Sequence, residues 1–142
     1  MLKGIPPILP PDLMKILMEM GHGDEIVIAD GNFPAASHAQ RLVRCDGHPV
    51  PPLLDAILQL LPLDTFVKHP VSLMTVVRGD KYSPEIWPAY EKIIKNHDAK
   101  FAGFEMLERQ AFYDRARKAY AVVATGELAR YANLILKKGL CS

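Results

Sequence analysis

Five polar residues of this chain are candidates for binding a hydroxyl-rich ligand and moving protons on it: His22, Asp30, Arg109, Tyr131 and Asn133. An imidazole titrates near neutral pH, so His22 could donate or relay a proton. A carboxylate such as Asp30 accepts hydroxyl hydrogen bonds, and Arg109 offers a rigid fork of donors. Tyr131 could stack on a ring and donate through its hydroxyl, while Asn133 offers both a donor and an acceptor.

Each of these residues also has a plainer interpretation. A lone histidine is weak evidence for a site, and His22 could only cap a helix or lie on the surface. Asp30 could form an Asx turn with the residues after it, and Arg109 could pair with an acidic neighbour on the surface. Tyr131 and Asn133 could be an ordinary loop tyrosine and turn asparagine. Residue types alone therefore leave the function open.

The elements around His22 and Asp30 predict where these two side chains lie. Residues 11–20 have apolar side chains at helical spacing, and Gly21 is placed to end the helix just before His22. Residues 25–29 form a predicted buried strand, so Asp30 should lie where that strand surfaces. Ligands of open α/β sheets bind in the crevice at this position. We expect the two loops to converge, so that the imidazole and the carboxylate face one ligand.

Helices and strands are predicted to alternate along the rest of the chain. The predicted strands cover residues 25–29, 42–45, 71–77, 101–108, 120–125 and 134–137, and the predicted helices cover residues 11–20, 34–40, 51–61, 82–96 and 110–119. This alternation predicts an α/β fold, in which helices cover both faces of a mixed, largely parallel sheet. With no repeat and no linker, residues 1–142 should form a single domain. Tyr113 and Tyr120 are expected in the core.

Composition argues against several classes of function. The 17 basic and 16 acidic side chains nearly balance, so the chain lacks the basic surface of nucleic-acid or membrane-binding proteins. No stretch approaches the ~20 apolar residues of a membrane span. Cys45 and Cys141 are far apart, and the five histidines match no metal-ligand spacing, so no metal site is expected. We expect a soluble, cytoplasmic domain.

Several motifs along nearly the whole chain resemble those of one family. They are EMGHGDEIVIADGNFPA at residues 19–35, RCDG at 44–47, AFY at 111–113, VVATGE at 122–127 and YANLILKKG at 131–139. With these motifs, in this order, the chain resembles the RbsD/FucU family of sugar mutarotases, and its fucose branch in particular.

The resemblance implies a fold, a reaction and residue roles. The fold would be a three-layer α/β/α sandwich with a sheet of about six strands. The reaction would interconvert the α and β anomers of L-fucose by acid–base ring opening and closure, without a metal or organic cofactor. His22 matches the family's proton-donor position. The positions that match substrate-binding residues are Asp30, Arg109, Tyr131, Ala132 and Asn133.

Some points stay open under this resemblance. The chain could instead be a D-ribose pyranase, or a monosaccharide-binding module without turnover. The family forms homo-oligomers, decamers or smaller, so a neighbouring copy could help to close the site, and His38 or His69 could contribute. Ala132 replaces a usual glycine, which is tolerable unless the position needs positive φ. Gln110 stands where relatives often have an aromatic residue.

Overall fold

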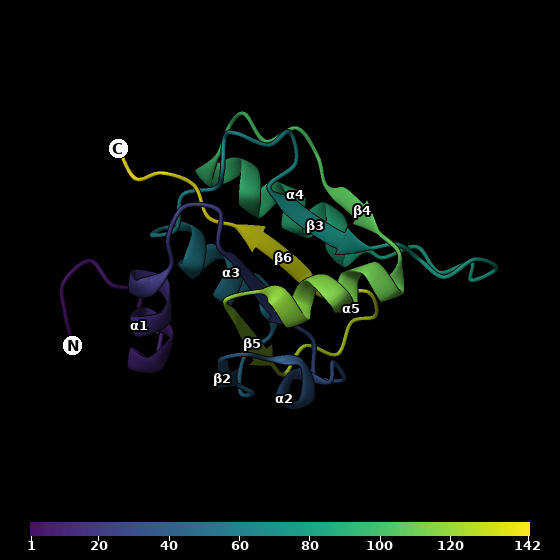
Figure 1. Cartoon of the computed structure of the whole chain (residues 1–142), viewed down its shortest axis with the longest axis horizontal. Helices are drawn as coiled ribbons and strands as arrows, with labels where there is room; N and C mark the ends of the chain where they lie inside the picture. The colour runs from purple at the N-terminus through teal and green to yellow at the C-terminus, as the bar shows by residue number, and fades with distance from the viewer.

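The computed structural model describes residues 1–142 as one six-stranded sheet with helices on both faces (Figure 1). The strands are β1 Glu25–Ala29, β2 Leu42–Cys45, β3 Val71–Met74, β4 Glu105–Leu107, β5 Ala121–Thr125 and β6 Leu134–Lys137. The helices are α1 Pro11–Glu19, α2 Ala35–His38, α3 Val50–Leu58, α4 Ile86–His97 and α5 Arg109–Lys118. None of these helices has both the length and the apolar character needed to span a bilayer.

The sheet is mixed, as predicted, and the last strand is the exception to its common direction. Its order is β2-β5-β1-β6-β3-β4. The pairs β1–β5, β2–β5 and β3–β4 are parallel, whereas β6 is antiparallel to both β1 and β3. The carboxyl ends of the five parallel strands and the amino end of β6 therefore share one edge of the sheet. The opposite edge holds the five amino ends and the carboxyl end of β6.

Both faces of the sheet are covered, which explains the continuous apolar sequence of β1. Side chains of Ile26 and Ile28 enter the larger core, together with α1, α3 and α4. Val27 and Ala29 point to the other face and pack with α2 and α5. Figure 1 shows α5 crossing one face of the sheet, with α3 and α4 on the other. A strand buried on both faces is typical of an α/β sandwich, and the predicted three layers are confirmed.

Two predicted strands are shorter in the structure. The strand expected at 71–77 ends at Met74, although the Thr75 N–H still donates to the Leu107 carbonyl at 2.8 Å. The strand expected at 101–108 is reduced to Glu105–Leu107. Gly103 has a left-handed φ of 106°, which interrupts the extended backbone before it. Apolar composition predicted these strands, but local backbone geometry sets their ends.

The Gly126-Glu127 pair at the end of β5 has a structural role. A Cβ atom on Gly126 would lie 2.2 Å from the Asp46 carbonyl oxygen, so only glycine fits this close approach of two loops. Glu127 Oε1 accepts from the Val50 N–H at 3.1 Å and thereby caps α3 from a distant loop. These contacts fix the start of the segment that leads to Tyr131.

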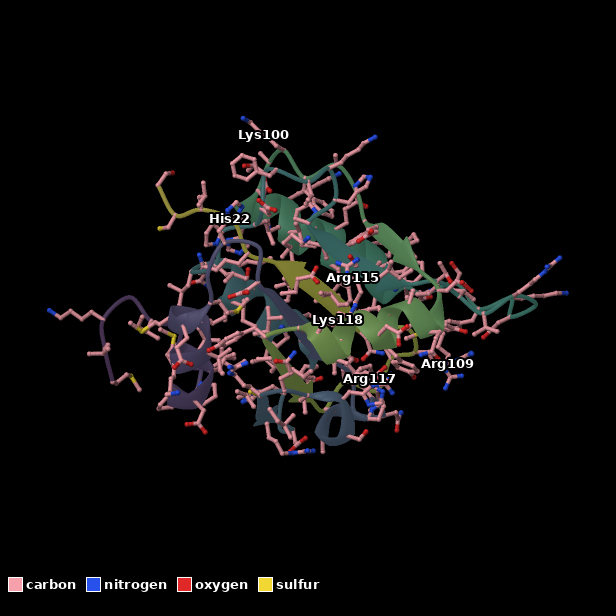
Figure 2. The ribbon with its side chains drawn as sticks, in the orientation of Figure 1. His22, Lys100, Arg109, Arg115, Arg117 and Lys118 are labelled. Atoms are coloured by element: carbon pink, nitrogen blue, oxygen red, sulfur yellow. The ribbon has the colours of Figure 1, made fainter.

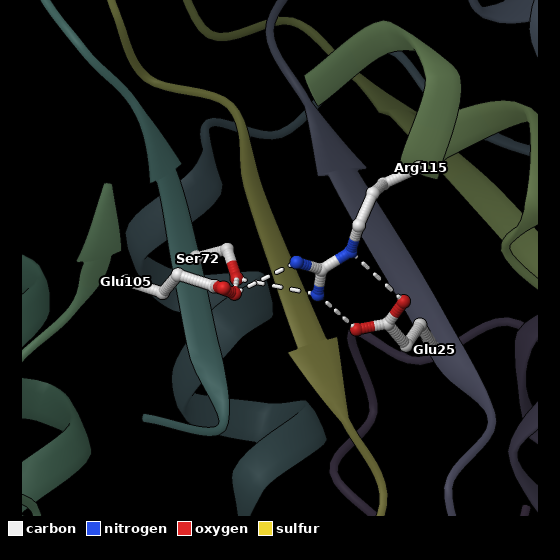
Figure 3. A network of polar contacts seen from close by, with 4 residues as sticks. All are labelled: Glu25, Ser72, Glu105 and Arg115. Carbon is white, nitrogen blue, oxygen red and sulfur yellow. Dashed lines mark hydrogen bonds and ion pairs between the residues drawn. The ribbon is translucent and has the colours of Figure 1, made fainter. Parts of the chain in front are cut away.

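Arg115 ties α5 to strands on either side of β6 (Figure 3). Its guanidinium donates to Glu105 Oε1 at 2.7 Å and forms a two-point contact with the Glu25 carboxylate. Ser72 of β3 also donates to Glu105, at 2.7 Å. The Arg115 guanidinium holds the pKa of the Glu105 carboxyl below its ordinary value, with a smaller lowering from Ser72. One cation thus links α5 with β1 and β4.

Replacing Arg115 by alanine should lower the free energy of unfolding by about 1–3 kcal/mol, because the partly buried carboxylates of Glu25 and Glu105 would both lose the cation that they share. Urea unfolding at pH 7 measures this. Because the folded pKa of Glu105 is lowered, its contribution is present at pH 7 and is lost as the pH falls through that pKa. Arg117→Ala is the control, since Arg117 makes only an exposed 3.4 Å pair with Asp114. Equal losses for both variants would contradict the assigned role of Arg115.

Candidate functional site

The sheet topology brings four of the predicted ligand-binding residues to one edge. Asp30 follows β1, Arg109 follows β4, and Tyr131 and Asn133 precede the antiparallel β6. All four line one open cavity of about 280 Å³. This volume lies near the lower end of small-molecule sites, ~300–1,000 Å³. The cavity also lies at the carboxyl ends of parallel strands, where α/β sheets bind ligands.

Asp30 and Asn133 are joined across this edge. The Asp30 N–H donates to Asn133 Oδ1 at 2.7 Å, and Asn133 is buried. Its amide oxygen is therefore occupied, and the amide NH₂ is the group left for a ligand. Asp30 Oδ1 accepts from the Asn32 N–H at 3.0 Å, which is the Asx turn of the plainer interpretation. That turn uses one carboxylate oxygen, and Asp30 also lines the cavity.

The Asp30 carboxyl has a raised pKa. Burial is the main cause, because it disfavours the charged form, and nearby Glu127 adds to the effect. The N–H groups of Asn32 and Phe33 and the Asn133 amide act in the opposite direction without cancelling it. A carboxyl with a raised pKa is better able to take up and return a proton than an ordinary surface aspartate.

Tyr131 is the one non-glycine residue in the chain with positive φ, at 58°. This left-handed conformation costs an L-residue roughly 1–2 kcal/mol. Trp87 Nε1 donates to the Tyr131 carbonyl at 2.7 Å, and the Tyr131 hydroxyl donates to Asp80 at 2.9 Å and accepts from the Val77 N–H at 3.2 Å. Protein groups therefore occupy the hydroxyl that was expected to donate to a ligand. The ring and the backbone of Tyr131 are what it offers to the cavity.

Ala132 does not need the backbone freedom of glycine, because the positive φ falls on the preceding residue. Its side chain is buried and does not line the cavity. Its carbonyl accepts from the Tyr90 hydroxyl at 2.7 Å. Burial raises the pKa of this tyrosine, so the hydroxyl stays protonated and remains a donor. Any contact of Ala132 with a ligand would have to come from its backbone.

Arg109 is the first residue of α5 and is in no ion pair. Its guanidinium is exposed and lies 5.4 Å from the centre of the Tyr113 ring. Tyr113 was expected in the core, but it is half-buried and lines the cavity beside Arg109. Gln110 donates to Asp114 Oδ1 at 3.0 Å on the exposed side of the helix, outside the cavity lining. The guanidinium of Arg109 is therefore available to a ligand.

His22 lies at the opposite edge of the sheet. It precedes β1, in a turn where the Gly23 N–H donates to the Lys138 carbonyl after β6. Figure 2 shows His22 and Arg109 on opposite sides of the molecule. An extended strand advances ~3.3 Å per residue, so β1 alone separates His22 from Asp30 by roughly 15 Å. The expectation that both face one ligand within a single chain is therefore wrong.

A buried carboxylate from a distant segment holds His22. Asp64 lies 3.0 Å from His22 Nε2, and the Phe66 ring packs 5.0 Å from the imidazole. Burial would raise the pKa of Asp64, but the Phe66 N–H and the imidazole outweigh it, and the net pKa is lowered. Because an ionised Asp64 can only accept a hydrogen bond, His22 Nε2 carries a proton and donates it to this contact. Nδ1 is then the ring nitrogen left for another partner. Asp24, the nearest acid in sequence, instead accepts from the Gly21 N–H at 2.8 Å.

The other candidate histidines do not join the cavity. The His38 ring packs 5.4 Å from Tyr113 at its margin, and its Nδ1 lies 3.1 Å from the Pro34 carbonyl. His69 precedes β3, at the edge that holds His22, and pairs with the Gly103 carbonyl at 2.9 Å. No group of three or more His, Cys, Asp or Glu side chains is arranged to hold a metal ion.

Asp30→Asn should raise the melting temperature at pH 7. A raised folded pKa means that the folded chain holds this proton more tightly than the unfolded chain, so ionisation of Asp30 costs stability as the pH rises through that pKa. The amide variant removes this cost, and its advantage should vanish below about pH 3.8, the ordinary value for aspartate. Asp98→Asn is the matched control, since Asp98 Oδ1 caps an exposed turn at Lys100 in the same way. A lower melting temperature for Asp30→Asn at pH 7 would contradict the raised pKa of Asp30.

Comparison with known proteins identifies the family to which the chain belongs. The model of the RbsD / FucU transport protein family matches residues 3–141. A mouse (Mus musculus) protein named fucose mutarotase is 51% identical over 97% of this chain and 94% of its own length. The crystal structure of the fucose mutarotase from Streptococcus pneumoniae in complex with L-fucose is 54% identical, with a TM-score of 0.93 over 99% of this chain and 100% of the other. FucU from Bifidobacterium longum is 53% identical, with a TM-score of 0.95 over the same shares. The chain belongs to the RbsD / FucU family.

Proposed function

We propose that this chain is an L-fucose mutarotase, an isomerase that interconverts the α and β anomers of the free sugar. The main support for the proposal is that the chain matches, over nearly its whole length, a fucose mutarotase whose structure was solved with L-fucose. The cavity at the carboxyl edge supports it, because a carboxylate, an amide and an unpaired guanidinium meet there. These groups suit the hydroxyls of a monosaccharide.

Ring opening and ring closure each need two proton movements, and a single bond breaks and re-forms. The anomeric hydroxyl loses its proton, the bond between C1 and the ring oxygen breaks, and the ring oxygen gains a proton. The open aldehyde rotates about the C1–C2 bond. The hydroxyl formed from the ring oxygen then attacks the other face of C1 and gives up its proton, while the carbonyl oxygen gains one and becomes the new anomeric hydroxyl. Positioning and moderate acid–base assistance suffice for this chemistry, which already proceeds in water.

We assign the sugar contacts to the carboxyl edge. Asp30 would accept hydrogen bonds from sugar hydroxyls, and its raised pKa fits it to exchange a proton with one of them. Arg109 and the Asn133 NH₂ would donate to sugar oxygens. Tyr131 would contribute its ring and backbone, since its hydroxyl is already paired.

We further propose that the proton-transferring His22 comes from a second copy of the chain. Within one chain it lies at the edge opposite to Asp30, yet the imidazole is part-exposed beside Phe66, which is 70% exposed. The rim of the cavity also exposes apolar side chains, with Leu128 83% and Val77 51% exposed. Burying such side chains between copies is favourable. Contact between the two edges would place the free Nδ1 face of His22 at the sugar.

An anomer-exchange assay tests the activity. NMR saturation transfer should show that wild-type chain accelerates exchange between the L-fucose anomers, and His22→Ala should reduce the catalysed rate by about 10²–10⁴. His48→Ala, a change of an exposed histidine outside the cavity, should leave the rate unchanged. Faster exchange of D-ribose than of L-fucose would instead indicate a pyranase. Sugar binding without faster exchange would indicate a binding module.

Complementation tests the shared site. His22→Ala and Asp30→Asn should each be inactive alone. When the two variants are co-expressed in equal amounts, random pairing across the interface should restore roughly a quarter of the wild-type rate, because one site in four receives both intact residues. If the mixture remains as inactive as the separate variants, His22 and Asp30 do not come from different copies.

A further inference from the structure

Asp80 is an acidic residue on the segment between β3 and α4, which projects beyond the sheet (Figure 1). Its Oδ2 accepts from the Tyr131 hydroxyl at 2.9 Å and pairs with the Arg130 guanidinium. Its Oδ1 accepts from the Tyr82 N–H at 2.9 Å. Both carboxylate oxygens are therefore engaged by the protein. Asp80 itself does not line the cavity, although Arg130 and Tyr131 do.

Asp80 holds Tyr131, whose backbone conformation is strained. Tyr131 has a φ of 58°, and its ring stacks on Tyr82 with centroids 6.1 Å apart. Two residues later, Asn133 accepts from the Asp30 N–H at 2.7 Å. A displacement of Tyr131 would therefore shift the backbone that carries Asn133 and loosen its bond to Asp30.

We propose that Asp80 is a positioning residue of the sugar site, which acts through the Tyr131 hydroxyl to hold Tyr131 and Asn133 in place for substrate. The assignment rests on the proposed mutarotase function. The carboxylate supplies a charged acceptor for the tyrosine hydroxyl, and hydrogen bonds to charged groups are the stronger ones. Arg130 keeps that carboxylate in place by its ion pair and by its contact with the Tyr82 ring, 4.7 Å from the centroid.

A double-mutant cycle tests the coupling. Asp80→Ala and Tyr131→Phe should each raise the KM for L-fucose roughly 10-fold, as expected for loss of a charged hydrogen bond, with a smaller change in kcat. The double variant should be no worse than the worse single one, because both changes break the same contact. Asp80→Asn keeps one acceptor oxygen and should lie between wild type and Asp80→Ala. Asp98→Ala is the control, because its carboxylate caps an equivalent Asx turn at Lys100, away from the cavity.

A second readout does not depend on sugar. Trp87 is the single tryptophan of the chain, and its Nε1–H donates to the Tyr131 carbonyl. The indole ¹H–¹⁵N resonance should therefore shift in Asp80→Ala and in Tyr131→Phe, and should stay in place in Asp98→Ala. Thermal unfolding identifies any variant that fails to fold, and Asp80→Asn then serves in place of Asp80→Ala.

The outcomes separate the two proposals. If wild-type chain does not exchange L-fucose anomers, the proposed function fails, whatever the indole signal shows. If wild type is active but Asp80→Ala leaves the KM within about 2-fold, or the KM effects of the two changes multiply to ~100-fold, the positioning role is overturned. A shift of the Trp87 signal together with a shared rise in KM supports it.

Discussion

The strand β1 separates His22 and Asp30, the two residues that we propose to act on one sugar. Its central side chains point alternately into cores on both faces of the sheet, so it can neither bend nor slip without exposing apolar surface. His22 precedes it and Asp30 follows it. No movement of loops alone closes a gap set by a buried strand. This constraint is the reason why we propose that a second copy of the chain completes the site.

The carboxyl edge of the sheet holds conformations that are unfavourable alone and are stabilised by their surroundings. Tyr131 has positive φ, and Asp30 carries a carboxyl whose ionisation is opposed by burial. Contacts from a distant element support Tyr131 and the adjacent Ala132, since the indole of Trp87 and the hydroxyl of Tyr90, both in α4, donate to their carbonyls. Strain and shifted pKa values often occur together at functional sites, because the surrounding fold can maintain them. Neither Trp87 nor Tyr90 lines the cavity, whereas Tyr131 does.

Periodicity and turn residues predicted the type and order of every helix and strand. They could not predict that β6 runs against its neighbours, because strand direction depends on pairing and not on local pattern. The Asx turn at Asp30 was foreseeable, since it involves residues two apart. The Asp64 partner of His22 was not, because it lies 42 positions away and follows no local signal. Asp80 was missed for the same reason: its link to Tyr131 spans 51 positions.

A crystal structure of this protein with bound L-fucose would test the central claim most directly. We predict one sugar in contact with the Asp30 carboxylate of one copy. The imidazole of His22 from another copy should lie within hydrogen-bonding distance, ~2.6–3.2 Å, of the ring oxygen or the anomeric hydroxyl. A sugar held at Asp30 and Asn133 with no imidazole near its reacting atoms would contradict it. So would a sugar bound at the His22 edge, away from any copy's Asp30.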